Sequence, residues 1–351
     1  MDKFVCIMNP ARIVFGRGSL SQLGAEVTRL GCKRALILAT PFQKADAECL
    51  ATKLGEAAAG TFTGAEMHTP VVVTEEALAV FSQVGADCLI SFGGGSTIGL
   101  GKAIAFRNDT PQIVVPTTYA GSEVTPILGE TEGGLKTTKR DPKILPETVI
   151  YDPDLTTSLP VPMSVASALN AMAHAVEALY AQDRNPIASL QAVEGIKALK
   201  DALPIIVATP GDIEARTRAL YGSWLCGTVL GAVGMALHHK LCHTLGGSFD
   251  LPHAETHAIL LPHSIAYNAV AAAKELAPVA EIFGDSAGGG LYDFAASISA
   301  PQALRDLGLA ESDLDKAADL AVKNAYWNPR PIERNAIRAL LQDAWQGARP
   351  K

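Results

Sequence analysis

The chain has 351 residues, 48% of them hydrophobic and 19% charged, which predicts a folded protein of two ordinary domains and excludes a disordered chain. Its formal net charge of −7 excludes nucleic acid as a partner, because there is no basic patch to neutralise phosphates, but it allows a small anionic substrate. We expect a cytoplasmic protein without a membrane span, because residues 1–20 lack a signal-peptide pattern and no run of about 18 apolar residues occurs.

In residues 1–150, short apolar runs alternate with helical patterns. The expected strands are Arg34–Thr40, Gly60–Met67, Asp87–Phe92 and Gln112–Pro116. The helices expected around and between them are Ser19–Leu30, Ala45–Ala59, Thr74–Val84 and Ser96–Phe106. This alternation predicts a parallel sheet with helices on both faces. Phe4–Ile7 and Arg12–Phe15 are expected to form a flanking hairpin.

From Ser164 onward the chain is rich in Ala and Leu at helical spacing and has no comparable strand pattern. The helices expected here are Ser164–Ala181, Pro186–Leu203, Ile213–Val229, Val233–Leu245, His253–Ala272, Gly290–Leu307 and Ile332–Gly347. We therefore expect an α/β dinucleotide-binding domain over residues 1–155 and an all-helical domain over residues 156–351. The active site is expected in the cleft between them.

Three glycines and a serine, Gly93-Gly94-Gly95-Ser96, connect the third expected strand to the following helix. Glycine lets the backbone turn tightly and approach a ligand, and the free N–H groups at a helix start attract an anion. The run differs from the Gly-x-Gly-x-x-Gly fingerprint, and it follows the third strand rather than the first. It predicts a phosphate-binding loop. The alternative is a tight strand-to-helix turn without a ligand.

A second polar loop, Pro116–Glu123, follows the fourth expected strand. Ligands of open α/β sheets bind beyond the carboxyl ends of the strands, and both loops lie at such ends. The alternative is that Ser122 merely caps a helix. The candidate cofactor-binding residues on the two loops are Gly94, Gly95, Ser96, Thr117, Thr118 and Ser122.

Seven of the eight histidines lie between residues 174 and 263. Asn170 and His174 are four residues apart on one expected helix and therefore share a face. His239 and His243 do the same on another helix, and His253 begins the next one. A lone histidine is usually a structural residue, but two such pairs and a third element predict a shared catalytic site formed by His243, His253, His174, His239 and Asn170. The spacing suits a divalent metal, whereas the neutral amide at position 170 binds a metal poorly.

Together these features resemble the iron-containing alcohol dehydrogenase family, which has a dehydroquinate synthase-like fold. The resemblance covers essentially the whole chain and rests on Gly93–Ser96, Pro116–Thr118, Ala171–Glu177, His239–Gly247 and Pro252–His263. The last three segments occur in the order and at the spacing of the family, which makes the resemblance specific.

Metal-dependent members of that family use an Asp and three histidines as ligands. The corresponding positions here are Asn170, His174, His239 and His253, so the Asp is missing. Gly99 likewise stands where the family usually has an Asp. Both departures resemble the maleylacetate reductase branch of the family, as do the segments Asn9–Gly16, Pro252–Ala258 and Tyr326–Pro331.

The resemblance to this branch implies reduction of the maleylacetate double bond by NADH or NADPH to give 3-oxoadipate, in the breakdown of aromatic compounds. It also implies a homodimer and no catalytic metal. Many family members have an acid near the end of the first strand, set against the adenosine ribose. Here the run is Thr40-Pro41-Phe42-Gln43, so Thr40 is the cofactor candidate at this strand and NADPH is as acceptable as NADH.

Maleylacetate carries an alkene conjugated to a ketone, with a carboxylate at each end, so the simplest chemistry is conjugate hydride addition. Charge then develops on the ketone oxygen, where we expect His243 and His253 to donate hydrogen bonds. His174, His239 and Asn170 are expected to shape the pocket. The two carboxylates need cationic partners, for which the candidates are Lys136, Lys139, Arg140, Lys240 and Arg330.

Three other functions are compatible with these residues. One is a metal-dependent alcohol or lactaldehyde-type dehydrogenase that tolerates Asn170, and another is a lyase related to dehydroquinate synthase, which needs NAD and zinc. A third is a catalytically silent dinucleotide-binding protein that senses redox state. Metal content and sensitivity to a chelator discriminate the first, and NADH binding without turnover of any substrate would identify the third.

Overall fold

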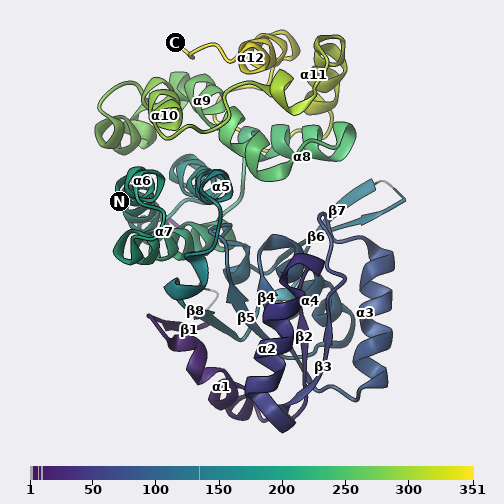
Figure 1. The fold of residues 1–351 in the computed structure, drawn as a ribbon. Coiled ribbons are helices and arrows are strands. Elements are labelled where there is room, and N and C mark those ends of the chain that lie inside the picture. Colours follow the sequence, from purple (N-terminus) through teal and green to yellow (C-terminus); the bar gives the residue numbers. More distant parts are fainter. Residues whose placement is uncertain (1–2, 7, 9–10, 134) are drawn as a thin grey trace. The chain divides into compact units, whose positions relative to one another are not determined.

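The structure is a computed structural model that describes residues 3–6, 8, 11–133 and 135–351. The chain divides into two compact units (Figure 1). Residues 8–159 form one of them, named here the α/β unit. Of the described residues, 3–6 together with 160–351 form the other, named the helical unit.

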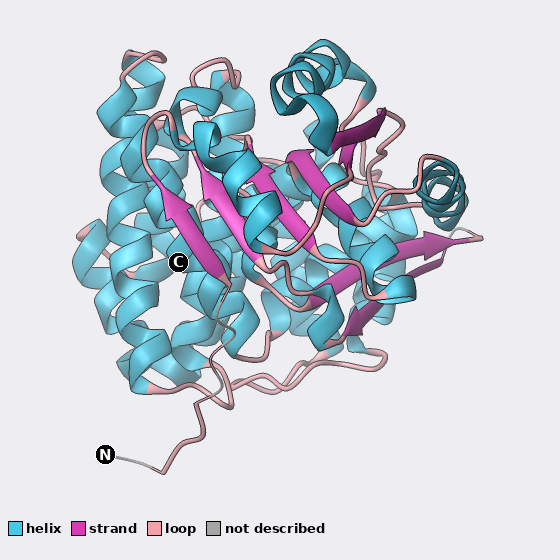
Figure 2. Ribbon diagram, turned by 90° about the horizontal axis from the view of Figure 1, so that it is seen from below, coloured by secondary structure: helices cyan, strands magenta, loops and turns pink. Residues whose placement is uncertain are grey.

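The α/β unit contains a six-stranded sheet in which all strands pair in parallel, in the order β1-β8-β5-β4-β2-β3 (Figure 2). Its strands are β1 (Arg12–Phe15), β2 (Ala35–Leu38), β3 (Ala58–Phe62), β4 (Cys88–Gly93), β5 (Gln112–Pro116) and β8 (Thr148–Tyr151). Its helices are α1 (Leu23–Arg29), α2 (Lys44–Leu54), α3 (Val71–Gln83) and α4 (Gly95–Asn108). The predicted parallel sheet is thereby confirmed.

Helices cover both faces of this sheet, as the strand–helix alternation predicts. Ile37 of β2 lies in one core with apolar side chains of α1 and α2. Leu36 of the same strand lies in the opposite core with side chains of α3 and α4. Burial on both sides explains why the strand reads as a continuous apolar run rather than as an alternating pattern.

The first strand differs from its prediction. Arg12–Phe15 pair in parallel with β8 and not in a hairpin with Phe4–Ile7. Residues 4–6 carry no strand, and Ile7 lies outside the described residues. The partner is Thr148–Tyr151, which was not among the expected strands. The two strands are far apart in the sequence, so no turn between them indicates that they pair. The pairing is seen only in the folded sheet.

A two-stranded antiparallel hairpin, β6 (Ile127–Glu132) and β7 (Leu135–Arg140), is also absent from the prediction. Its strands are largely polar, so they lack the apolar runs by which the other strands are found. An ion-pair network holds it in place: the buried carboxylate of Glu130 accepts from Arg107 of α4 at 3.0 Å and also pairs with Lys139.

The helical unit agrees with the predicted all-helical second half of the chain. Its helices are α5 (Val161–Tyr180), α6 (Pro186–Ala208), α7 (Ile213–Ala232), α8 (Leu237–Phe249), α9 (His253–Phe283), α10 (Ala287–Ser297), α11 (Leu314–Val322) and α12 (Arg334–Gln346).

Several helices differ from the prediction in their bounds, and one was not predicted. α9 is kinked at Ala272, where the predicted helix ends, and continues to Phe283. α10 ends at Ser297, because Ser299 adopts a left-handed φ of 57° and Pro301 follows. α11 was not predicted at all, since it is only 9 residues long.

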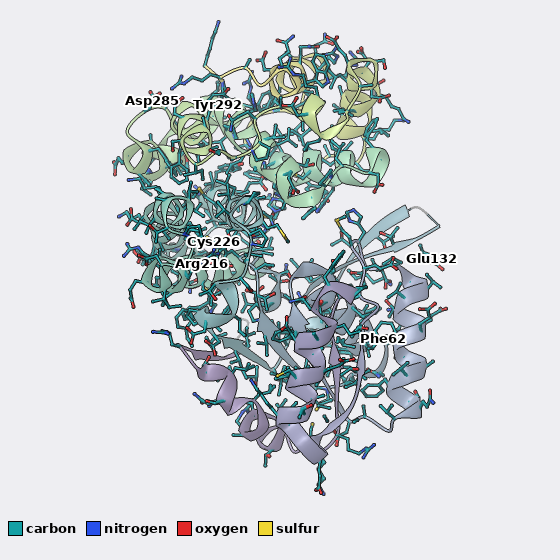
Figure 3. The ribbon with its side chains drawn as sticks, in the orientation of Figure 1. Phe62, Glu132, Arg216, Cys226, Asp285 and Tyr292 are labelled. Carbon is teal, nitrogen blue, oxygen red and sulfur yellow. The ribbon has the colours of Figure 1, made fainter. Side chains whose placement is uncertain are left out.

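A buried arginine fixes the start of α5, the helix that carries Asn170 and His174. Arg216 of α7, labelled in Figure 3, has no exposed surface and donates to the Ser164 hydroxyl at 2.7 Å. It also donates to the carbonyl of Pro210 at 2.9 Å. Buried charges need such partners, so this contact sets the position of α5 against α7.

The start of α8 is determined by the side chain of Glu177 on α5. The pattern predicts a helix from Val233, but the helix begins at Leu237. The carboxylate of Glu177 on α5 accepts from the backbone N–H of Ala236 at 3.0 Å and of His238 at 2.8 Å. These bonds satisfy N–H groups that have no partner within the helix.

Within the described residues, no single helix is long and apolar enough to cross a membrane. Only α7 and α8 taken together have the required length and composition, and they are bent by 96° against each other.

Candidate active site

Three loops of the α/β unit follow neighbouring strands at their carboxyl ends. Thr40 follows β2, the glycine run follows β4 and Thr117 follows β5. These strands are adjacent in the order β5-β4-β2, and the connections from β2 and β4 run in opposite directions across the sheet. Ligands of open α/β sheets bind at such a switch point, so the structure brings the predicted cofactor residues to one edge.

A side chain would not fit at two positions of the glycine run, Gly93 and Gly94. A Cβ at Gly93 would lie 2.7 Å from the side-chain oxygens of Gln43 and Thr97, and Gly93 has a positive φ of 148°. A Cβ at Gly94 would lie 2.8 Å from Cγ2 of Thr118. A Cβ at Gly95 would have no heavy atom within 4 Å. The glycine run is therefore closely packed at Gly93 and Gly94 and open at Gly95, where α4 begins.

Hydrogen bonds join the three loops into one surface. The Thr40 hydroxyl donates to Oε1 of Gln43 at 3.3 Å, and Nε2 of Gln43 donates to the Thr117 hydroxyl at 3.1 Å. The backbone N–H of Thr117 donates to the carbonyl of Gly93 at 3.0 Å. No side chain caps the start of α4, so its first N–H groups stay available for an anion.

A buried lysine of α4 anchors the loop after β5. The ammonium of Lys102 donates to the hydroxyl of Thr125 at 2.9 Å, to the carbonyl of Ile127 at 3.0 Å and to the carbonyl of Ser122. Its three protons thus have three acceptors. Burial lowers the pKa of Lys102 to about 7, against the opposing charge of Glu123. Ser122 is therefore fixed by its backbone, and its predicted side-chain role in cofactor binding stays a prediction.

The glycine at position 99 is explained by a neighbouring threonine. A Cβ at Gly99 would lie 2.3 Å from the hydroxyl oxygen of Thr69, a buried residue with a left-handed φ of 49°. An aspartate at this position would therefore have to displace Thr69.

Six histidines of the helical unit form one cluster: His174, His238, His239, His243, His253 and His257. The rings of His174 and His239 lie 5.2 Å apart between centroids, and the ring of His257 lies 5.0 Å from that of His239. Asn170, His174 and His239 are each about 5% exposed or less. Asn170 Oδ1, His174 Nδ1 and His239 Nε2 have no hydrogen-bond partner in the described part of the chain. Such buried, unpaired polar atoms indicate a site that a ligand completes.

A carboxylate that the sequence reasoning did not include holds His239. Glu177, one turn after His174, is fully buried and accepts from Nδ1 of His239 at 2.6 Å. Burial by itself raises the pKa of Glu177, but His239, His238 and the backbone N–H of Ala236 lower it to about 2. The carboxylate is therefore charged and accepts the Nδ1 proton of His239, which fixes the orientation of that ring.

A second hydrogen-bond chain fixes the tautomer of His257. The Ser264 hydroxyl donates to the carbonyl of Leu260 at 2.9 Å and must therefore accept from Nδ1 of His238 at 3.0 Å. Burial and the charge of His239 lower the pKa of His238 to about 3, so its Nε2 is bare and accepts from Nδ1 of His257 at 2.9 Å. Burial also lowers the pKa of His257, so its Nε2 carries a lone pair.

His243 and His253, the two predicted donors, are half-buried. Nδ1 of His243 lies 3.0 Å from the hydroxyl of Tyr326, and its ring lies 6.1 Å from that of His239. The ring of His253 lies 4.5 Å from that of His257. The more exposed side of the cluster therefore carries both donors, together with Tyr326.

The basic candidates for carboxylate binding lie in different surroundings. Lys139 is paired with Glu130, and Arg140 is exposed on β7. Arg330 stacks 3.9 Å from the ring centroid of Tyr267 and donates to its carbonyl at 3.1 Å. The side chain of Lys136 lies outside the described ones. Lys240 is half-buried beside the histidine cluster.

The residues at the positions that correspond to the family's metal ligands do not fit a tight metal site. Two groups of three His, Cys, Asp or Glu side chains among the described residues place their ligand atoms within 4.8 Å of one another: His238–Cys242–His257 and Cys32–Asp87–Cys88. His174, His239 and His253 are not among them. The fourth position is the neutral Asn170, and the charge of Glu177 is already bound by His239 Nδ1 and backbone N–H groups.

Glu177, Tyr326 and His257 are the residues that sequence reasoning missed. Glu177 lies in the segment Ala171–Glu177, at i+3 from His174, which places it on the same helix face and could have indicated it. Tyr326 gives no such signal, because it is 83 residues from His243 and only the fold brings the two together.

Profiles of two family descriptions match the chain. Iron-containing alcohol dehydrogenase matches residues 10–153, and the C-terminal part of the Fe-containing alcohol dehydrogenase family matches residues 164–345. Together they span both units.

Several individual proteins are similar over the full length. A maleylacetate reductase of Rhizobium sp. (strain MTP-10005) is 64% identical, over 100% of both chains. A maleylacetate reductase of Burkholderia cepacia is 53% identical, again over 100% of both chains. The crystal structure of maleylacetate reductase from Agrobacterium tumefaciens is 64% identical, covers 100% of both chains and superposes with a TM-score of 0.97.

Proposed function

The chain belongs to the iron-containing alcohol dehydrogenase family, and on that premise we propose that it reduces the carbon–carbon double bond of maleylacetate to give 3-oxoadipate. The observation that carries the proposal is the identity of 64% with a maleylacetate reductase over the whole length of both chains. We further propose that the reaction serves the degradation of aromatic compounds in the cytoplasm.

The reductant of this proposal is NADH or NADPH, which supplies a hydride from its nicotinamide. The residues at the carboxyl ends of β2, β4 and β5 fit a dinucleotide. The backbone N–H groups of Gly95 and Ser96 at the uncapped start of α4 would hold its pyrophosphate. Thr40, Gly94, Thr117 and Thr118 line the loops beside them. No acid follows Thr40 in its loop, so a 2′-phosphate meets no repulsion there.

The histidine cluster supplies the polar groups for the substrate in this proposal. Hydride addition to the alkene leaves negative charge on the ketone oxygen, which His243 and His253 stabilise by hydrogen bonds, while a proton goes to carbon. A preorganised donor aimed at such charge contributes about 3 kcal/mol. Asn170, His174 and His239 shape the pocket, and Glu177 holds the ring of His239.

We propose that these donors act without a metal ion. In support, the position of the family's acidic ligand holds Asn170, and the three histidines are not arranged as a close ligand group. Neutral imidazoles and an amide provide hydrogen bonds without needing a cation to balance them.

The first test is NADH oxidation by purified, chelator-dialysed protein with maleylacetate, followed by addition of zinc or ferrous iron. We expect rapid oxidation before any metal is added, and no increase afterwards. Activity that appears only after metal addition would overturn the metal-free proposal and favour a metal-dependent alcohol dehydrogenase. Absence of maleylacetate turnover under both conditions would overturn the proposed reaction itself.

Replacing His243 tests the assignment of the donors. The change His243→Ala should lower kcat by about 100-fold, because it removes one donor at the developing charge. The Kd for NADH, measured by fluorescence titration, should stay within about twofold of the wild-type value, because His243 lies outside the proposed dinucleotide loops. An unchanged kcat would contradict the role of His243.

We also propose a homodimer. In the described residues β1 lies at the edge of the sheet, and Met8, of the same unit, is 71% exposed. An edge strand is a surface that a second copy can cover. Light scattering, compared with the 36.7 kDa of one chain, measures the assembly.

A further inference from the structure

Lys240 is a cation without an anion. It lies on α8 between His239 and His243 and is half-buried. No carboxylate among the described residues forms an ion pair with it. A partly desolvated ammonium without a counter-charge is unfavourable, and an anionic ligand would relieve that cost.

The surroundings of Lys240 connect it to the predicted donor His243. Its Nζ lies 5.9 Å from the ring centroid of Tyr326, and the hydroxyl of the same tyrosine lies 3.0 Å from Nδ1 of His243. Lys240 and His243 are three residues apart on one helix and so share a face. The side chain of Tyr326 therefore lies near both the ammonium and the imidazole that faces the reacting ketone in the proposed function.

The other basic candidates lack this combination. Lys139 is neutralised by Glu130, and the guanidinium of Arg330 is occupied by the ring and carbonyl of Tyr267. Both therefore have partners that a substrate would have to displace. Lys240 has only a weak cation–π contact at the edge of its range, which a carboxylate can replace or share.

We propose that Lys240 binds a carboxylate of the substrate and is the residue that makes the site specific for a dicarboxylate rather than a neutral alcohol or aldehyde. The inference rests on the proposed function. An ammonium–carboxylate hydrogen bond is charge-assisted, and because it is made in the bound substrate and in the transition state alike, its loss appears mainly in KM. Tyr326 orients the ammonium and His243 together.

The test compares Lys240→Met, Lys240→Arg and the wild type. The methionine variant keeps the aliphatic stem but loses the charge, and we expect KM for maleylacetate to rise by at least tenfold, with kcat changed less than threefold. The arginine variant should restore KM to within about threefold of wild type. Lys274→Met, which removes an exposed lysine of the same unit, is the matched control and should leave KM unchanged. Thermal unfolding of each variant checks that it is folded.

The outcomes separate this inference from the proposed function. If wild-type protein reduces maleylacetate and Lys240→Met has an unchanged KM, Lys240 is not a carboxylate ligand. If Lys240→Met weakens NADH binding as much as it raises KM, Lys240 acts through the cofactor and the inference is also wrong. If the wild type does not consume NADH with maleylacetate, the proposed function fails before Lys240 is tested.

Discussion

The free energy of unfolding is expected to fall steeply as the pH is lowered from 7 to 5. Four buried histidines cause this: His174, His238, His257 and His263. Burial lowers the pKa of each, to about 3 for His238 and about 4 for His263, and well below 6.5 for the other two. They are therefore neutral in the folded protein over this range.

The sign follows from the order of protonation. An unfolded histidine takes up a proton near pH 6.5, while the folded one takes it up only at its lowered pKa. The stabilising difference is complete above pH 6.5 and is lost progressively as the pH falls from 6.5 towards the folded pKa values, below which the loss is complete. Each histidine then costs about 1.4 kcal/mol per pH unit below 6.5, or roughly 2 kcal/mol between pH 7 and 5. Summed over the four histidines, this cost is comparable with the whole free energy of unfolding of a typical domain.

Urea unfolding at several pH values, followed by tryptophan fluorescence, measures this effect. His263→Asn is the informative variant, because His263 lies outside the proposed catalytic group and its Nε2 has no partner among the described residues. With one of four buried histidines removed, the pH slope should fall by about a quarter. A wild-type stability that is flat from pH 7 to 5 would contradict the neutral, buried state of the cluster.

Turnover is expected to fall by about 10³-fold in Glu177→Gln, with a loss of about 3 kcal/mol in the free energy of unfolding. Both oxygens of Glu177 accept from donors: Oε2 from Ala236 N–H and His239 Nδ1, and Oε1 from His238 N–H. The amide of glutamine would place an N–H against one of these N–H groups in either orientation. At least one bond is therefore lost, and the ring of His239 no longer lies against a charged carboxylate.

A readout other than rate distinguishes this role from simple destabilisation. At a temperature where Glu177→Gln is fully folded, the pH profile of kcat should change in shape, because a buried charge in hydrogen-bond contact with His239 is gone. Glu177→Asp keeps the charge and should recover part of the activity. A glutamine variant that is folded and has wild-type kcat would show that the Glu177–His239 bond is structural only.

The predictable parts of the protein were those that depend on local patterns. The apolar run Ala35–Leu38 and the matching run at β5 predict buried strands, because a strand covered on both faces needs apolar side chains at every position. The glycine run predicts a tight connection from strand to helix, and the structure has one at Gly93 and Gly94, where a Cβ would contact neighbouring side chains. The i, i+4 spacing predicts that His239 and His243 share a face of one helix, because helix geometry alone puts such residues there.

Other features were decided by contacts between distant segments. The sequence predicts that β1 forms a hairpin, but β1 pairs in parallel with β8. Parallel strands are not joined by a short turn, so no local sequence signal indicates this pairing. α8 starts four residues later than its apolar pattern, because Glu177 accepts the N–H groups of Ala236 and His238.

The sequence by itself determined the residue types of the site: the histidines, the neutral Asn170 and the glycine run. The tertiary structure alone decided their chemical states. Glu177 is charged and Nδ1 of His239 holds a proton because one fully buried carboxylate meets several donors. His257 Nε2 carries no proton, because the proton of that ring is on Nδ1 and is donated to Nε2 of His238. Nδ1 of His238 donates in turn to the Ser264 hydroxyl, which donates to the carbonyl of Leu260. Burial and donor geometry set these states, and neither can be read from spacing along one helix.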